Sequence, residues 1–104
     1  MISEVWIFPT RIYRRGKPGP GDMEKQIHSK EQKILLLLLR ELREQAGVRQ
    51  VDLAKKLKRH QSFVSKFESG ERRLDILELR EICKALGVAF AQVTVELDRR
   101  LRRA

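Results

Sequence analysis

Residues that support disulfides, metal sites and membrane insertion are scarce in this sequence of 104 residues. Its single cysteine, Cys83, excludes an internal disulfide framework and suits a reducing cytosol. The two histidines, His28 and His60, are far apart and have no Cys, Asp or Glu at ligand spacing, so no metal site is predicted. The longest apolar run, from Ile34 to Leu39, has six residues, whereas a membrane-spanning helix needs about 20.

Sequence features of export and of catalysis are also missing. Residues 1–8 have neither a basic leader nor a long apolar stretch, so we expect no signal peptide and a cytoplasmic location. No Ser/His/Asp set, paired-carboxylate arrangement or glycine-rich phosphate loop is recognisable. We therefore predict that the protein is not an enzyme and uses no cofactor.

Positive charge is the most prominent feature that is present. The chain has 23 Lys and Arg residues against 14 Asp and Glu, a formal net charge of +9 at pH 7. This excess favours polyanionic partners, with nucleic acid first and an acidic membrane or acidic protein second. Hydrophobic residues make up 41% of the chain, enough for the small core of one domain with little left for a buried active-site cavity.

A segment rich in glycine and proline, GKPGPGD at residues 16–22, divides the chain. The stretch before it, SEVWIFPTRIYRR, is rich in aromatic and β-branched residues, which predicts a strand-like or extended segment. We therefore assign residues 1–27 to an N-terminal extension with its linker, and residues 28–104 to a helical domain.

The N-terminal extension has three possible interpretations. It can be an arm that reaches the minor groove or backbone of DNA through its basic side chains. It can be a strand that pairs with its copy in a dimer and covers Leu36 and Leu37. Alternatively, Met23 is the natural start, and the residues before it are translated upstream sequence. The basic side chains of the first interpretation are Arg11, Arg14, Arg15 and Lys17.

The remainder of the sequence predicts five helices. Their expected ranges are 29–47, 50–57, 61–69, 75–87 and 90–102. A capping box begins the fourth helix, because Asp75 is followed three residues later by Glu78. Gly70 and Gly87 are suitable C-terminal caps of the third and fourth helices.

Apolar periodicity assigns the inward faces of these helices. One face of the first helix consists of Leu35, Leu39, Leu42 and Ala46. Leu36 and Leu37 fall off that face, so we expect this helix to bury two sides. The stripe on the fifth helix consists of Val93, Leu97 and Leu101. This stripe has little left to cover in a four-helix core, so we expect it to form a dimer interface.

The second and third helices, joined by a short turn, are typical of a helix-turn-helix motif. In that motif the second helix enters the major groove of DNA, where base edges present donors and acceptors. The exposed face of the 61–69 helix is polar and not acidic, as such insertion requires. Its candidate base-reading residues are Gln61, Ser62, Ser65 and Lys66.

Basic residues surround this motif. From residue 49 to residue 73 the sequence has eight basic and three acidic residues, a local excess of +5. Such an excess is the electrostatic signature of phosphate binding. The residues that we assign to DNA beside the reading helix are Lys58, Arg59, His60, Arg72 and Arg73.

The residues of this region resemble the Cro/C1-type (XRE) helix-turn-helix DNA-binding family. The resemblance covers about residues 35–88, through the stretches LRELREQAGVRQVDLAKKL and QSFVSKFESGERRLDILELREICKALGV. It implies that Gln50 binds a phosphate at the start of the second helix, and that Arg43 pairs with Glu68. The family often has glycine where Lys58 stands, because the turn requires a positive φ. His60 stands where a small polar residue or proline is common.

The sequence therefore predicts an all-α, five-helix, lambda-repressor-like domain preceded by an extended N-terminal segment. We expect a sequence-specific transcriptional regulator that binds double-stranded DNA as a homodimer, with no metal, cofactor or membrane partner. One alternative is an antitoxin-like protein-interaction module in which DNA binding is secondary. Another is a sequence-neutral binder of RNA or of the nucleoid.

Overall fold

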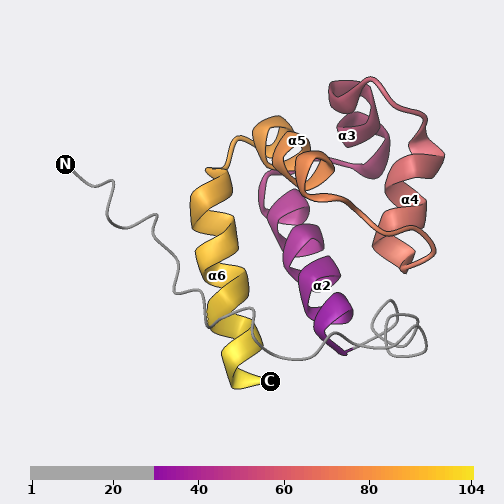
Figure 1. Cartoon of the computed structure of the whole chain (residues 1–104). Coiled ribbons are helices and arrows are strands. Elements are labelled where there is room, and N and C mark those ends of the chain that lie inside the picture. The colour runs from indigo at the N-terminus through magenta and orange to yellow at the C-terminus, as the bar shows by residue number, and fades with distance from the viewer. Residues whose placement is uncertain (1–29) are drawn as a thin grey trace.

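The computed structural model describes residues 30–104, which form helices joined by short turns, with no strand in this range (Figure 1). Its helices are α2 (Lys30–Gln45), α3 (Gln50–Leu57), α4 (Gln61–Ser69), α5 (Ile76–Leu86) and α6 (Phe90–Arg103). The prediction of five helices is confirmed. The expected strand-like segment and the boundary between residues 27 and 28 lie outside the described residues.

Local signals place the ends of these helices close to the predicted positions. At the start of α5 the Glu78 backbone N–H donates to Asp75 Oδ1 at 2.7 Å, and the Asp75 N–H donates to Glu78 Oε1 at 3.0 Å. Gly70 and Gly87 end α4 and α5 in the left-handed conformation, with φ of 87° and 74°. The first helix is the exception, because it ends at Gln45, two residues before the predicted end.

The five helices enclose one hydrophobic core. Its most deeply buried large side chains are Leu39, Leu53, Val64, Phe67 and Ile82, which come from α2, α3, α4 and α5. Cys83 is buried among them, and burial raises the pKa of its thiol, which disfavours the nucleophilic thiolate.

The α2 helix differs from the expectation at two positions. Leu36 is buried as predicted, but Leu37 is 56% exposed. Leu37 follows about 100° further round the helix, and in the described part of the chain no other helix covers that direction. Ala46 is exposed rather than inward, because α2 has already ended and helical periodicity no longer sets its direction.

The α6 helix also differs from the expectation, because it completes the core instead of standing outside it. It lies antiparallel beside α2 (Figure 1), and its Val93 is only 4% exposed. Leu97 packs against the same core, and Leu101 is half-buried. Arg100 of α6 donates to Glu41 of α2 at 2.9 Å, which joins the two helices at their polar edge. Val93 is therefore unavailable for a dimer interface.

Candidate nucleic-acid interface

The α3 and α4 helices form the helix-turn-helix, and a tight turn separates them. Lys58 follows α3 in the left-handed conformation, with φ 56° and ψ 42°. This conformation closes α3, because the Lys58 N–H donates to Lys55 O at 3.1 Å and the Arg59 N–H to Ala54 O at 2.9 Å. The turn therefore has the positive φ that the resemblance implied, with lysine where glycine is less strained.

His60 is the N-cap of α4. Its Nδ1 accepts a hydrogen bond from the Ser62 backbone N–H at 3.2 Å and lies 3.0 Å from the Ser62 hydroxyl oxygen. This bonding requires an unprotonated Nδ1, so the Nε2–H of the ring remains as a hydrogen-bond donor. His60 thus fills the position of a capping residue.

The α4 helix has two chemically different faces. Phe63, Val64 and Phe67 point into the core. Gln61 and Lys66 are exposed, and neither side chain hydrogen-bonds with any residue between 30 and 104. Ser62 and Ser65 are half-buried, and the Ser65 hydroxyl donates to Ser62 O at 3.3 Å. The four predicted reading residues therefore share one helix, with Gln61 and Lys66 the most accessible.

The expected pair of Arg43 and Glu68 is present, and Gln50 joins it. Arg43 donates to both carboxylate oxygens of Glu68, from Nε at 2.6 Å and from Nη2 at 3.1 Å. Its Nη1 donates to Val48 O at 2.9 Å. Gln50 Nε2 donates to Glu68 Oε1 at 2.9 Å, so one of its amide hydrogens is used inside the protein. Gln50 keeps a second amide N–H for the phosphate contact that the resemblance implies.

Arg59 and Arg72, both assigned to DNA, meet at the side of α4. The guanidinium carbon of Arg59 lies 3.9 Å from the centroid of the Phe63 ring, and that of Arg72 lies 4.8 Å away. Arg72 donates to both oxygens of Glu78 at 2.9 and 2.8 Å, and this contact lowers the pKa of the Glu78 carboxyl. Arg73, in contrast, is exposed.

Phe63 and Glu78 are contributors that the sequence did not identify. Glu78 was recognised only as part of a capping box, and Phe63 was assigned no role. Basic residues on both sides of α4 are a signal for such a cluster, but the sequence does not say that α5 brings a carboxylate between them.

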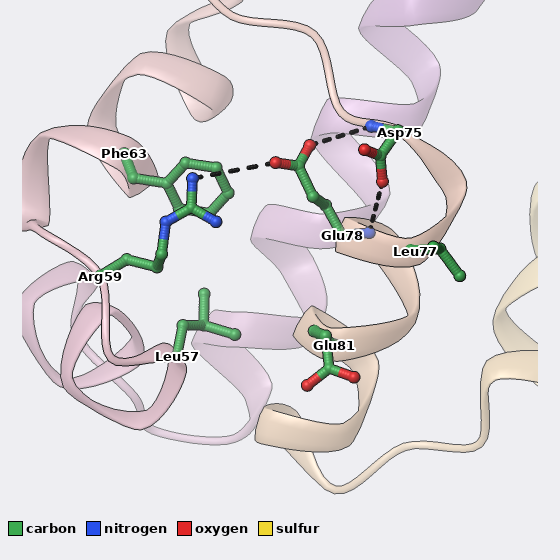
Figure 2. A pocket seen from close by; sticks show the side chains of 7 residues that line it. All are labelled: Leu57, Arg59, Phe63, Asp75, Leu77, Glu78 and Glu81. Carbon is green, nitrogen blue, oxygen red and sulfur yellow. Dashed lines mark hydrogen bonds and ion pairs between the residues drawn. The ribbon is translucent and has the colours of Figure 1, made fainter.

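A small cavity adjoins this cluster (Figure 2), with a volume of ≈ 190 Å³. It lies between the turn that precedes α4 and the first turns of α5. The volume is below the roughly 300 Å³ that small-molecule sites usually need. The lining residues are Leu57, Arg59, Phe63, Asp75, Leu77, Glu78 and Glu81.

No group of three or more His, Cys, Asp or Glu side chains is placed to hold a metal ion within residues 30–104. In the same range, no helix combines the length and the apolar character needed to cross a lipid bilayer.

Known proteins share this architecture. A family model described as a helix-turn-helix domain matches residues 34–97. The structure is similar to that of an XRE-family like protein from Pseudomonas syringae pv. tomato str. DC3000, with 41% identity and a TM-score of 0.68. That match covers 75% of this chain and 95% of the other. No curated protein matches the chain.

Two more distant structures have names that describe regulators. A mutant of the restriction-modification controller protein C.Esp1396I is 27% identical, with a TM-score of 0.65 and coverage of 70% of this chain and 92% of the other. The clp gene regulator ClgR from Corynebacterium glutamicum is 26% identical, with a TM-score of 0.62 and coverage of 71% and 79%.

These matches and the geometry of α3 and α4 define a helix-turn-helix DNA-binding protein of the class that regulates transcription. Within that class the chain belongs to the Cro/C1-type (XRE) family.

Proposed function

We propose that this regulator recognises a specific DNA sequence by placing α4 in the major groove. The observation that carries the proposal is the exposed, non-acidic face of α4, on which Gln61 and Lys66 have no hydrogen-bond partner between residues 30 and 104. A glutamine amide pairs with adenine through two hydrogen bonds, and lysine donates to guanine. Ser62 and Ser65 are only half-buried, and their hydroxyl groups suit either a base edge or a phosphate.

The phosphate contacts come from the residues around α4. Lys58, His60 and Arg73 are exposed and surround the ends of that helix. Gln50 supplies a further phosphate contact at the start of α3, because the backbone N–H groups of a helix N-terminus favour an anion. These contacts fix the orientation of the protein on the duplex and supply most of its non-specific affinity.

We further propose that the protein binds as a two-fold dimer through α6. One helix-turn-helix reads few base pairs, and a symmetric pair of half-sites about one helical turn apart supplies the missing information. Because Val93 belongs to the core, the interface is on the outward side of α6. There Val95 is 68% exposed, and the small residue Ala91 stands one turn before it.

Selection of bound duplexes from random DNA by the purified full chain tests this proposal. We expect an enriched sequence with two symmetric half-sites. Gln61→Ala should weaken binding to that sequence by about 1–3 kcal/mol and relax the preference at one base position. Gln45→Ala removes another exposed glutamine, from the end of α2, and should leave every base preference unchanged. An equal loss with Gln61→Ala on all sequences would show that Gln61 does not read bases.

A protein-interaction module is the second candidate function. Ile76 and Leu77 are exposed at 63% and 68% in the first turn of α5, and Leu77 lines the cavity in Figure 2. Adjacent exposed apolar side chains are typical of protein contacts. Random-DNA selection separates the two functions. Failure to enrich any sequence would favour the interaction module, or a sequence-neutral binder if affinity for random duplex is high.

A further inference from the structure

The cluster around Phe63 contains two arginines and one carboxylate. Phe63 is 7% exposed, yet the guanidinium groups of Arg59 and Arg72 both approach its ring. Glu78 of α5 contacts both arginines, with Oε2 at 2.8 Å from Arg72 Nη2 and at 3.8 Å from Arg59 Nη2. In Figure 2 the Arg59 guanidinium lies over the Phe63 ring, and a dashed line joins it to the Glu78 carboxylate. Both arginines thus share the one carboxylate of Glu78, and Asp75 and Glu81 line the cavity beside them.

The two arginines differ in what their N–H groups do. Arg72 donates from Nη1 and Nη2 to Glu78, and Nη1 also donates to Arg73 O at 2.8 Å. Arg59 donates no hydrogen bond to any residue of the described range, and 43% of its side chain is exposed. The guanidinium plane of Arg59 is therefore held in position while its N–H donors stay available. The N–H donors of Arg72 are largely occupied by Glu78 and Arg73.

Resting on the proposed function, we propose that Phe63 and Glu78 hold Arg59 as a preorganised binding group for a DNA phosphate beside the recognition helix. Arg72 is then a structural residue that keeps Glu78 in place. A free arginine loses rotamer freedom when it binds, and one already stacked on a ring loses less. Arg59 also precedes His60, the N-cap of α4, and the N-terminal end of this nine-residue helix favours an anion.

The number of phosphate contacts can be measured through the salt dependence of binding. We would titrate one fluorescent mixed-sequence duplex with the full chain at several KCl concentrations. Each neutralised phosphate adds about 0.9 to the slope of log K against log salt. Arg59→Ala should lower the slope by about that amount. The pair Arg72→Gln/Glu78→Gln, which leaves the net charge unchanged, should not alter the slope.

The positioning role of Phe63 needs a readout that simple destabilisation does not produce. Phe63→Leu keeps an apolar side chain but removes the ring face, and should weaken binding about threefold to tenfold while the slope stays the same. In the Arg59→Ala background the same substitution should have no further effect. Phe63→Tyr preserves the ring and should retain the wild-type affinity. Arg59→Lys keeps the charge without the planar stack, and should match Phe63→Leu.

The outcomes separate this inference from the proposed function. A wild-type chain that does not bind duplex DNA would refute both. If the wild type binds, the inference alone is overturned by an unchanged slope in Arg59→Ala, or by a fallen slope in the Arg72/Glu78 pair. It is also overturned if Phe63→Leu weakens binding equally with and without Arg59. Thermal melts identify variants that do not fold. If Phe63→Leu does not fold, Arg59→Lys on the exposed turn tests the stacking contact in its place.

Discussion

Glu68 near the end of α4 accepts two hydrogen bonds from Arg43 of α2, and only 7% of its side chain is exposed. The pair therefore joins the reading helix to the helix behind it, and Gln50 extends the connection to the start of α3. One carboxylate thus orients three helices. The orientation of α4 relative to α3 decides how the reading face meets DNA, so this pair is the structural basis of the proposed binding mode.

Removal of either partner of this pair should strongly destabilise the protein. Glu68→Ala leaves the Arg43 guanidinium buried without its carboxylate, with an expected cost of about 3–5 kcal/mol. Thermal or urea unfolding measures the change. The matched control is Arg40→Ala, because the Arg40–Glu44 pair on the same helix has side chains 61% and 56% exposed. Its loss should cost at most about 1 kcal/mol. Superimposed melting curves of Glu68→Ala and wild type would contradict the burial of the pair.

Replacement of Lys58 by glycine should raise the stability of the fold and lower its affinity for DNA. Lysine at φ 56° is strained, and Lys58→Gly should stabilise the fold by up to about 1 kcal/mol, since relief of strain exceeds the added unfolded-state entropy. The same change removes a positive charge from the proposed phosphate contacts, so DNA binding should weaken. Lys58→Asn, which also tolerates this conformation, should show the same two directions. A destabilised Lys58→Gly would contradict the strain argument.

Stability should fall in acid partly through Glu78. Hydrogen bonds from Arg72 hold the pKa of the folded-state carboxyl below its ordinary value of 4.5. A depressed folded-state pKa means that the charged carboxylate stabilises the fold at neutral pH, and that this contribution is lost as pH falls through the folded-state value. Glu78→Gln should therefore melt below wild type at pH 7, and the difference should shrink as pH falls below 4.5.

The matched control for this pH dependence is Glu81→Gln. Glu81 is on the same helix, and its ion pairs with Arg80 and Lys84 are 3.9 and 3.8 Å long, with no hydrogen bond to a described residue. Its melting curves should follow wild type at every pH. A difference between Glu78→Gln and wild type that stays constant from pH 7 to pH 3 would show that the carboxylate charge contributes no stability.

The proposed dimer predicts a position-specific effect on α6. Val95→Asp places a charge in the interface and should raise the dimer dissociation constant at least about tenfold, or 1.4 kcal/mol. Sedimentation equilibrium at micromolar concentration measures this. Leu77→Asp is the control, because Leu77 is also 68% exposed but belongs to α5. A monomer mass for the wild type at all concentrations would refute the dimer. If Leu101→Asp dissociates the dimer and Val95→Asp does not, the interface lies on the side of α6 that contains Leu101.

The helices and the motif that they form could be predicted from the amino-acid sequence. Helix ends depend on local features, such as the Asp75–Glu78 capping box and the glycines at positions 70 and 87, and local features are legible in one chain. Apolar spacing likewise placed Leu39 on the inward face of α2, where it is buried. The family pattern added the pair of Arg43 and Glu68, which are 25 positions apart in sequence and whose contact no periodicity indicates.

The neighbours that cover each helix face, in contrast, depend on how the helices pack together. Periodicity places Val93 on an apolar stripe, but it does not show that the core of the same chain buries this side chain rather than a second copy. The cluster of Arg59, Phe63 and Glu78 likewise exists because α5 crosses beside the turn that precedes α4. Contacts of this kind depend on how helices pack, and packing depends on all the core side chains together, so no short stretch of sequence contains the answer.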